Sequence, residues 1–408
     1  MEYRDQLNYI KSHRYDEEDR RKKRNRNRRK KQKKISVFDK FLWMVLFVLS
    51  VLFVSLMYLS EIFPVPYLIG VGGILLAFLM IIKIKQQRAR RLAGIKRVSK
   101  GRVLALLLST VLVLGGFYFI KIFIAMDEIA IGEESGEYTE EHLINVEEKP
   151  FNIYISGIDV YGEITKESRS DVNLVVTVNP KTHKILITTT PRDYYVTIPG
   201  VSGEYRDKLT HAGIYGIDTS MDTLENLYST EIPFYARVNF SSVIEIVDAM
   251  GGIDVDSEVA FTTSKASGTV VDIKEGKNHL NGKQALAFVR ERKAFLSGDN
   301  QRGRNQQILL EALIKKMISP KFIIQANDVI DRVVGNAETN MSETQMKKLI
   351  RMQLNDLEGW EIESIAATGD DSGKQYCYSY SAAPLYVCVP DAAVVEEISQ
   401  KMEEYLSY

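Results

Sequence analysis

The chain has 408 residues, and its 53 Lys and Arg balance 53 Asp and Glu, so its formal net charge is zero. This length excludes a single small domain and predicts more than one structural unit. The zero net charge conceals an asymmetry, because residues 20–34 form a dense basic run whereas the sequence after residue 126 is acidic overall. The charge of the whole chain therefore says nothing about partners, and its parts have to be considered separately.

Three apolar segments predict helices that span a membrane. They cover residues 41–59, 67–82 and 103–120. A helix rises about 1.5 Å per residue, so roughly 20 apolar residues cross a hydrocarbon core of about 30 Å. The second segment reaches this length when Val65 and Ile84 are included. A cleavable signal peptide is not expected, because the first segment is too long and begins too far from the N-terminus.

Basic residues predict the orientation of these spans. Residues 1–40 and the connection 83–102 are rich in Lys and Arg, whereas the connection 60–66 contains neither. Basic loops stay on the cytoplasmic side. We therefore expect a cell-membrane protein with a cytoplasmic N-terminal tail, three spans within residues 41–124 and an outward-facing remainder that starts with an acidic stalk, residues 125–149. The tail lacks interleaved aromatic residues, so we expect it to contact membrane lipids and not nucleic acid.

Residues 150–408 predict one mixed α/β domain. Residues 151–158 alternate as a strand does, and two further strands, 171–178 and 184–190, are joined by a turn short enough to predict an antiparallel hairpin. These strands are apolar on both faces, which fits a central position in a sheet covered by helices. We also expect helices capped by Asp218 or Thr219 and by Ser241, helices over 281–288 and 304–318, two helices beyond Pro320 and a final strand over 385–389.

The two cysteines, Cys377 and Cys388, both lie in the predicted outward domain. In an oxidising compartment, a pair that brackets a short loop predicts a disulfide. Two buried free thiols are the alternative. A metal site is not expected there, because no third Cys or His lies close by in the sequence.

Charged side chains gather at the ends of predicted strands and at the start of a predicted helix. They are Asp159, Arg169, Asp171, Arg192, Arg290, Arg292, Asp299 and Arg302. Guanidinium groups match phosphate oxygens and stay charged, and neighbouring carboxylates suit a divalent cation that bridges them to phosphate. Gln306 shares a helix face with Arg302, and a helix start near Arg302 favours an anion. The pattern predicts a pyrophosphate site, with surface ion pairs as the alternative for any single Arg–Asp pair.

Other catalytic patterns are missing from the sequence. His183, His211 and His279 have no Ser or Cys in a nucleophile motif. There is no P-loop, no HExxH and no nucleotide-binding glycine motif. Phosphate chemistry without a protein nucleophile is therefore the favoured hypothesis.

Seven stretches carry a resemblance to a known family. They are YISGIDVYG (154–162), SRSDVNLVVTVNP (168–180), ITTTPRDYYV (187–196), DKLTHAGIYG (207–216), GGIDV (251–255), LNGKQALAFVRER (280–292) and GDNQRGRNQQ (298–307). In their order and spacing, over about residues 150–395, they resemble the LytR–CpsA–Psr family of cell-wall glycopolymer transferases. The three-span anchor and the Gly-Ile-Asp-x-Tyr-Gly form resemble its capsule-associated branch. The resemblance implies an extracellular α/β/α sandwich with a mixed central sheet.

The resemblance also implies roles for individual residues. Asp159 and Asp171 match magnesium-associated aspartates, so Mg²⁺ or Mn²⁺ is the expected cofactor. Arg169, Arg192, Arg290 and Arg292 match catalytic, pyrophosphate-contacting arginines, Arg302, Gln306 and Lys208 match further phosphate contacts, and Asp299 matches a pocket residue. Many members have an Arg shortly after the first Asp, whereas this chain has Val160-Tyr161, so that contact is absent or comes from elsewhere.

In the family fold, the interior of the domain holds a polyprenyl tail. The apolar residues that could line such an interior in this chain are Ile187, Phe240, Val243 and Leu313. For each of them, ordinary core packing is the favoured interpretation.

The implied activity is transfer of an undecaprenyl-pyrophosphate-linked glycopolymer, a capsular polysaccharide or a teichoic-acid-like polymer, to a peptidoglycan hydroxyl by phosphoryl transfer. Expected partners are the lipid-linked polymer, peptidoglycan, membrane lipids and capsule-synthesis machinery. Two alternatives stay open: hydrolysis of the same lipid pyrophosphate by water, and a non-catalytic membrane regulator of capsule synthesis.

Overall fold

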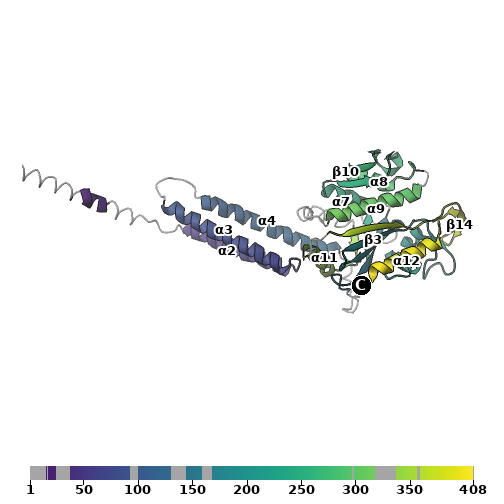
Figure 1. Cartoon of the computed structure of the whole chain (residues 1–408), viewed down its shortest axis with the longest axis horizontal. Coiled ribbons are helices and arrows are strands. Elements are labelled where there is room, and N and C mark those ends of the chain that lie inside the picture. Colours follow the sequence, from purple (N-terminus) through teal and green to yellow (C-terminus); the bar gives the residue numbers. More distant parts are fainter. Residues whose placement is uncertain are drawn as a thin grey trace, which may run out of the picture. The chain divides into compact units, whose positions relative to one another are not determined.

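The computed structural model describes residues 15, 17–23, 37–91, 100–129, 144–158, 168–295, 298–317, 337–355 and 359–407, without the side chains of 86–100, 122–123, 125–129 and 298–300. The chain divides into two compact units, residues 1–119 and 120–408. Each unit is described by itself. Figure 1 labels the helices and strands.

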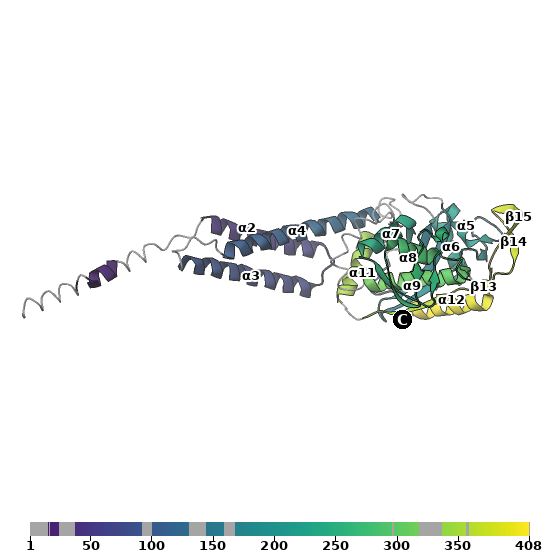
Figure 2. The same cartoon turned by 90° about the horizontal axis from the view of Figure 1, so that it is seen from above.

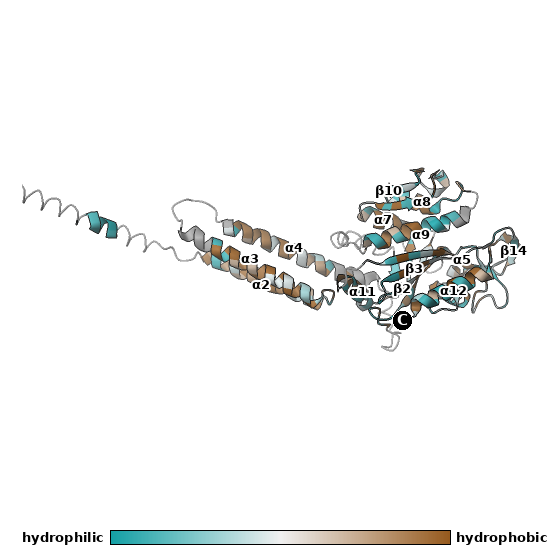
Figure 3. Cartoon of the chain, viewed as in Figure 1, coloured by the Kyte–Doolittle hydropathy of each residue, from teal (hydrophilic) through white to brown (hydrophobic). Residues whose placement is uncertain are grey.

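The first unit is built from long apolar helices. They are α2 (Val37–Leu59), α3 (Val65–Arg91) and α4 (Lys100–Ile129). Each contains a stretch of at least 21 residues that is long and apolar enough to cross a membrane, as predicted, and Figure 3 shows their hydrophobic character. Leu46, Leu79 and Leu112 belong to the core of this unit. Arg102 donates to Asp39 from Nε (2.6 Å) and Nη2 (3.2 Å), which ties the start of α2 to the start of α4.

The second unit contains a six-stranded mixed sheet in the order β11-β6-β1-β2-β3-β12. Its strands are β11 (Ala337–Thr339), β6 (Phe234–Asn239), β1 (Phe151–Ile158), β2 (Ser170–Asn179), β3 (Lys184–Thr189) and β12 (Glu361–Ala366). The three strands predicted from the sequence are β1, β2 and β3, and the hairpin of β2 with β3 is antiparallel, with Val176 opposite Ile187. β1 pairs with β6 and β3 pairs with β12 in parallel.

Helices cover both faces of the sheet. Consecutive strand residues point to opposite faces, so Val175 packs with α6 (Ile217–Tyr228) and α12 (Ala392–Leu406), whereas Val176 packs against α9 (Gly298–Met317) and α11 (Glu343–Asn355). Figure 1 shows α12 and α9 on opposite sides of β3. The predicted α/β/α sandwich is confirmed.

A further apolar cluster lies over α9. It joins α7 (Phe240–Ala249), α8 (Gly282–Arg290), β7 (Ile253–Ser257) and β10 (Gly276–Leu280). Helices α7 and α8 approach closely, since a Cβ placed on Gly282 would lie 2.2 Å from the carbonyl oxygen of Ile244. This close crossing positions the helices that carry residues 240 and 290 at the site described below.

The remaining elements are short and connect the larger ones. They are β4 (Tyr195–Val196), β5 (Asp207–Lys208), α5 (Leu209–Ala212), β8 (Phe261–Thr262), β9 (Asp272–Ile273), β13 (Gly369–Asp370), β14 (Lys374–Cys377), β15 (Tyr380–Tyr386), β16 (Val389–Pro390) and the 3-10 turns Gly213–Tyr215 and Lys265–Ser267. β4 pairs with β5, and β14 with β15, as antiparallel ribbons.

The predicted helix starts differ from the observed ones. Helix α7 is capped by Asn239, whose side chain accepts from the backbone N–H of Ser242, and Ser241 is not the cap. Helix α6 follows Gly216, which has φ 116°, instead of Asp218 or Thr219. Several polar residues could cap each helix by propensity, and the path of the preceding chain decides between them.

Helix α9 starts at Gly298, six residues before the predicted start at 304. Arg302 is therefore the fifth residue of the helix, so a helix start lies near it, as predicted. The predicted helix over 281–288 is α8, which Asn281 caps.

Two predictions near the C-terminus are also wrong. Residues 385–389 are not one strand, because β15 ends at Tyr386 and β16 begins at Val389. Cys377 and Cys388 are both buried thiols, and the predicted disulfide is not formed. Cys377 lies in the β14–β15 ribbon, whereas the backbone of Cys388 bonds to Asp193 and Tyr195, so different segments hold the two residues.

The end of the predicted stalk belongs to the domain core. Val146 is fully buried, and Ile144 packs against the same cluster. Gln345 on α11 donates to the carbonyl of Ile144 at 3.3 Å. Residues 130–143 of the predicted stalk lie outside the described residues.

Replacing Gly282 with Ala is expected to destabilise the domain. The added Cβ meets backbone at 2.2 Å, which cannot move aside as a flexible side chain could. Overpacking of this kind costs roughly 1–3 kcal/mol, and the melting temperature should fall by several degrees. Thermal unfolding of the purified full chain measures the change. Gly359→Ala is the control, because nothing lies within 4 Å of the place that its Cβ would take; equal melting temperatures for the two variants would contradict the close crossing of α7 and α8.

Candidate functional site

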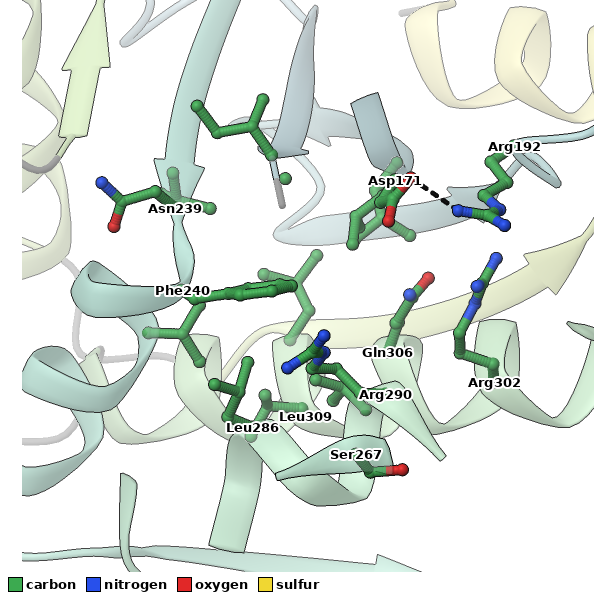
Figure 4. Close-up of a pocket in the computed structure, with 18 of the residues that line it drawn as sticks. Asp171, Arg192, Asn239, Phe240, Ser267, Leu286, Arg290, Arg302, Gln306 and Leu309 are labelled. Carbon is green, nitrogen blue, oxygen red and sulfur yellow. Dashed lines mark hydrogen bonds and ion pairs between the residues drawn. The ribbon is translucent and has the colours of Figure 1, made fainter. Parts of the chain in front are cut away.

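A cavity of about 220 Å³ lies in the second unit between the sheet and helices α7, α8 and α9. Figure 4 shows that its two ends differ in chemistry. Four polar side chains, those of Asp171, Arg192, Arg302 and Gln306, lie towards one end, whereas the amide of Asn239 lies at the opposite side. Phe240, Leu286 and Leu309 line the other part, with Arg290 between.

The apolar wall is made by both layers. The sheet contributes Ile155 and Leu174, and the helices contribute Phe240, Val243, Leu286, Leu309 and Leu313. Core packing was the favoured interpretation for four of the apolar positions. It is confirmed for Ile187, which is fully buried in the core. It is incomplete for Phe240, Val243 and Leu313, which belong to a core cluster and also face the cavity.

Arg192 stands beyond the end of β3 and is held by carboxylates on two sides. Its Nη1 donates to Oδ1 of Asp171 on β2 at 2.8 Å, and its Nε lies 3.5 Å from Oδ2 of Asp193. Asp193 also accepts from Nζ of Lys208 at 2.8 Å. The guanidinium of Arg192 is therefore fixed in direction at the polar end of the cavity.

Arg290 and Arg292 both line the cavity because of the way in which α8 ends. Arg290 is the last residue of α8, and Glu291 has extended backbone angles, φ −67° and ψ 129°. An extended residue turns its neighbours to one side and its own side chain to the other. The guanidinium of Arg290 lies 4.1 Å from the ring centroid of Phe240, within the range of a cation–π contact.

Glu291 is fully buried on the side away from the two arginines. Its carboxylate accepts from the backbone N–H of Ser264, from the hydroxyl of Ser267 (2.7 Å) and from the backbone N–H of Ala294 (3.0 Å). Burial by itself would raise the pKa of Glu291, but these hydrogen bonds outweigh it and lower the pKa to about 2. The ionised carboxylate thus holds the 264–267 segment against the end of α8.

Arg302 and Gln306 enter the cavity from α9. They are one helical turn apart, and they are 7% and 8% exposed. Arg304, two residues from Arg302, instead faces outward with a side chain that is 57% exposed and 3.3 Å from Glu258. The same helix therefore carries a cavity-facing arginine and a surface arginine.

Most of the residues predicted to form the site lie together. Asp171, Arg192, Arg290, Arg292, Arg302 and Gln306 all line the cavity. Lys208 does not line it and adjoins it through Asp193. Arg169 precedes β2, is exposed and is not among the lining residues. Asp159 and the side chain of Asp299 lie outside the described residues, so their roles stay predictions.

Several site residues were not predicted. Asp193 and Glu291 stand inside the quoted PRD and RER stretches. Asp193 contacts Arg192, and Glu291 holds Ser264 and Ser267. Lys293 follows directly and also lines the cavity. A charged residue next to a predicted phosphate arginine could have indicated all three. Ser264 and Ser267 line the cavity from a short turn, and no local sequence pattern indicates them.

Fixed positive charge at one end of an apolar cavity suits a particular class of ligand. Guanidinium groups bind phosphate oxygens through paired donors, and the aliphatic wall takes up a hydrocarbon chain. The fold and the site therefore define a protein with three helices long and apolar enough to cross a membrane, and an α/β domain whose pocket suits an amphipathic, phosphorylated molecule.

Comparison with known proteins identifies the family. The model of the LytR_cpsA_psr family matches residues 118–389, more than half of the chain. The chain belongs to the LytR–CpsA–Psr family.

The relatives include a protein named polyisoprenyl-teichoic acid–peptidoglycan teichoic acid transferase TagU, from Bacillus mycoides strain KBAB4. It is 34% identical over 259 residues, which cover 63% of this chain and 79% of the relative. Among solved structures, B. subtilis TagV is similar with a TM-score of 0.53 and 30% identity, covering 64% of this chain and 98% of that chain. A structure of TagT bound to LIIa-WTA has a TM-score of 0.51 and 27% identity, covering 67% and 97%.

Glu291→Gln is expected to lower stability most at neutral pH. The pKa of Glu291 is about 2 in the folded chain, below its ordinary value of 4.5. The carboxylate therefore stabilises the fold above about pH 4.5, and this contribution is lost as the pH falls towards 2. The difference in melting temperature between wild type and variant should shrink from pH 7 to pH 3.

Thermal unfolding at pH 7, 5 and 3 measures this difference. Glu258→Gln is the control, because Glu258 is an exposed partner of a surface arginine and should change stability little at any of these pH values. If the difference in melting temperature between wild type and Glu291→Gln is the same at all three pH values, the ionised carboxylate of Glu291 does not stabilise the fold.

Proposed function

We propose that this chain transfers a glycopolymer from a polyprenyl-pyrophosphate carrier to a hydroxyl group of peptidoglycan by phosphoryl transfer. The observation that carries the proposal is the cavity, in which four arginines lie at or near the mouth of an apolar chamber. A polyprenyl pyrophosphate has the matching parts, a doubly charged head and a long hydrocarbon tail. The names of the relatives support a teichoic-acid-like polymer.

The residues suggest how each part of the donor is held. Arg192, Arg290 and Arg302 bind the pyrophosphate oxygens, and Gln306 donates to them from the same helix face as Arg302. The tail lies along Phe240 and the leucines of α8 and α9. These contacts place the sugar-linked phosphorus at the polar end, where an acceptor can approach.

The reaction is an exchange at that phosphorus. A new bond forms between the acceptor oxygen and the phosphorus, and the bond from the phosphorus to the bridging oxygen breaks. Polyprenyl phosphate departs, and the acceptor hydroxyl loses its proton. Fixed guanidinium groups stabilise the charge that develops on the transferred and departing phosphates, so no protein nucleophile is needed. Asp159 or Asp171 is the carboxylate that receives the proton in this proposal.

The expected cofactor, Mg²⁺ or Mn²⁺, fits the oxygen donors of the site. Asp171 lines the cavity, and magnesium is commonly held by one or two carboxylates together with substrate phosphates. In the part of the chain that the structure describes, no group of three or more His, Cys, Asp or Glu could hold a metal by itself. Asp171, with Asp159 as predicted from the sequence, would hold the ion, which neutralises phosphate charge when bound.

The proposal includes a location. The basic tail and the loop 83–102 lie in the cytoplasm, and the second unit faces outward, where peptidoglycan is found. Membrane lipids surround α2, α3 and α4, and capsule-synthesis machinery stays a predicted partner.

Arg302→Ala is expected to lower the rate of transfer by about 10²-fold or more, because it removes a charge-stabilising donor from the cavity. The purified full chain is given a polyprenyl-pyrophosphate-linked polymer and peptidoglycan, and the covalent polymer–peptidoglycan product is measured. The matched control is Arg304→Ala, on the same helix but outside the cavity, which should keep the wild-type rate. Wild-type transfer by Arg302→Ala or by Arg290→Ala would contradict the assignment.

The same assay separates transfer from hydrolysis and from regulation. A transferase forms the covalent product when peptidoglycan is present, whereas a hydrolase releases polymer phosphate equally well without it. A chain that lacks residues 1–34 should keep its activity, since the cavity lies entirely in the second unit. Loss of function in that variant would favour the regulator.

Removing divalent cations is expected to stop transfer. EDTA should abolish product formation by the purified chain, and added Mg²⁺ or Mn²⁺ should restore it. Asp171→Asn should need a higher cation concentration for half-maximal rate, because it loses a charged oxygen ligand. Full activity in EDTA would contradict the requirement for a divalent cation, and the arginines alone would then stabilise the phosphate charge.

A further inference from the structure

The β14–β15 ribbon exposes a cluster of tyrosine rings. The exposed fractions are 62% for Tyr376, 48% for Tyr378, 47% for Tyr380 and 39% for Tyr386. Within residues 374–386 only Cys377 is buried. Figures 1 and 2 both show the ribbon at the edge of the second unit. Large apolar surfaces that stay in contact with water commonly mark binding sites.

The tip of this ribbon is held firmly although its side chains face outward. Isolated two-stranded ribbons are only marginally stable. Here Asp207, which is fully buried, accepts from the backbone N–H of Ser379 at 2.8 Å and from His211 at 2.6 Å. The backbone N–H of Tyr378 donates to the carbonyl of Arg206, and the hydroxyl of Tyr195 donates to the carbonyl of Tyr376.

Burial would raise the pKa of Asp207, but hydrogen bonds from His211, Ser379 and the backbone N–H of Lys208 lower it overall. The carboxylate that anchors the tip therefore stays ionised. All the ribbon's bonds to Asp207, Arg206 and Tyr195 described above use main-chain atoms of the ribbon, so the tyrosine rings themselves are not needed to hold it.

Side-chain contacts connect the ribbon to the polar end of the cavity. Lys208 follows the anchoring Asp207, and its ammonium group lies 2.8 Å from Asp193 and 5.8 Å from the ring centroid of Tyr386. Asp193 in turn contacts Arg192, which lines the cavity. A chain of side-chain contacts thus links the ribbon to one of the arginines of the cavity.

The composition of the ribbon fits a glycan. The face of a tyrosine ring carries partial negative charge and packs against the C–H groups on the flat side of a sugar ring. The residues between the rings, Ser379, Ser381, Ala382 and Ala383, are small and leave the ring faces accessible. A membrane-binding tip would instead be expected to carry several basic residues beside its aromatic rings, and this ribbon has the single Lys374.

From these observations we propose that the β14–β15 ribbon binds the acceptor, a glycan strand of peptidoglycan, and guides its hydroxyl to the cavity mouth. The inference rests on the proposed transfer reaction and names the surface that its second substrate uses. The rings provide affinity through stacking, and the link from Lys208 to Arg192 sets the position of the ribbon relative to the phosphate site.

The test compares the triple variant Y376A/Y378A/Y380A with Y376F/Y378F/Y380F, which keeps the rings. Each purified full chain is titrated with soluble peptidoglycan glycan strands that have been freed of attached polymer. The alanine variant should bind about tenfold or more weakly, since each stacked ring contributes a part of the affinity. The phenylalanine variant should stay near wild type, and the KM for the lipid-linked donor should be unchanged in both.

Three results would overturn the proposal. The first is wild-type glycan affinity in the alanine variant. The second is a loss of glycan affinity in the phenylalanine variant as large as that in the alanine variant. The third is an alanine variant that binds anionic phospholipid vesicles more weakly than wild type but binds glycan equally well. Thermal unfolding of both variants controls for folding. Arg302→Ala should keep glycan binding while it loses transfer. If the wild-type chain binds glycan through its tyrosines yet forms no covalent product, then the transfer reaction is wrong and the docking surface stands.

Discussion

The site depends on gathering like charges at one end of an apolar cavity. Guanidinium groups that line one cavity repel one another, and the apolar walls weaken the screening that water would provide. The structure offsets the repulsion with Asp171 and Asp193 around Arg192, and with the ring of Phe240 beneath Arg290. Glu291 stands between Arg290 and Arg292 in the sequence. Its ionised side chain is hydrogen-bonded to Ser264 and Ser267 and so fixes the chain that carries the two arginines. The arginines are therefore positioned before any phosphate arrives, as charge stabilisation in catalysis requires.

The fold explains why a cavity forms beside these charges. The central sheet is sealed on one face by α6 and α12, whose side chains pack it tightly. On the other face, α9 packs against the sheet along only part of its length, and α7 and α8 extend the layer outward. The gap between the two apolar clusters is the cavity, and the strand ends that open into it carry the charged residues.

The sequence predicted those parts in which local pattern and tertiary structure agree. Strands β1 to β3 have buried, apolar residues on both faces, and the arginines stand beside recognisable strand and helix ends. Helix starts were less predictable, because Ser241 and Asp218 are as good caps in isolation as the residues that the chain path selects. β12 escaped prediction because Glu361, Glu363 and Ser364 make half of its residues polar, as in a surface segment. The clamp of Glu291 on Ser264 and Ser267 joins residues more than twenty positions apart, which no local pattern shows.

Mass spectrometry of lipid extracted from the purified full chain tests the central claim most directly. Wild type and a cavity-filling variant, Leu313→Trp, are compared after the same purification, since residue 313 lines the cavity. The account predicts a polyprenyl phosphate or pyrophosphate bound to wild type and strongly reduced in the variant, with ordinary phospholipids equal in both. Polyprenyl lipid absent from wild type, or retained equally by the variant, would contradict a cavity that holds the lipid carrier.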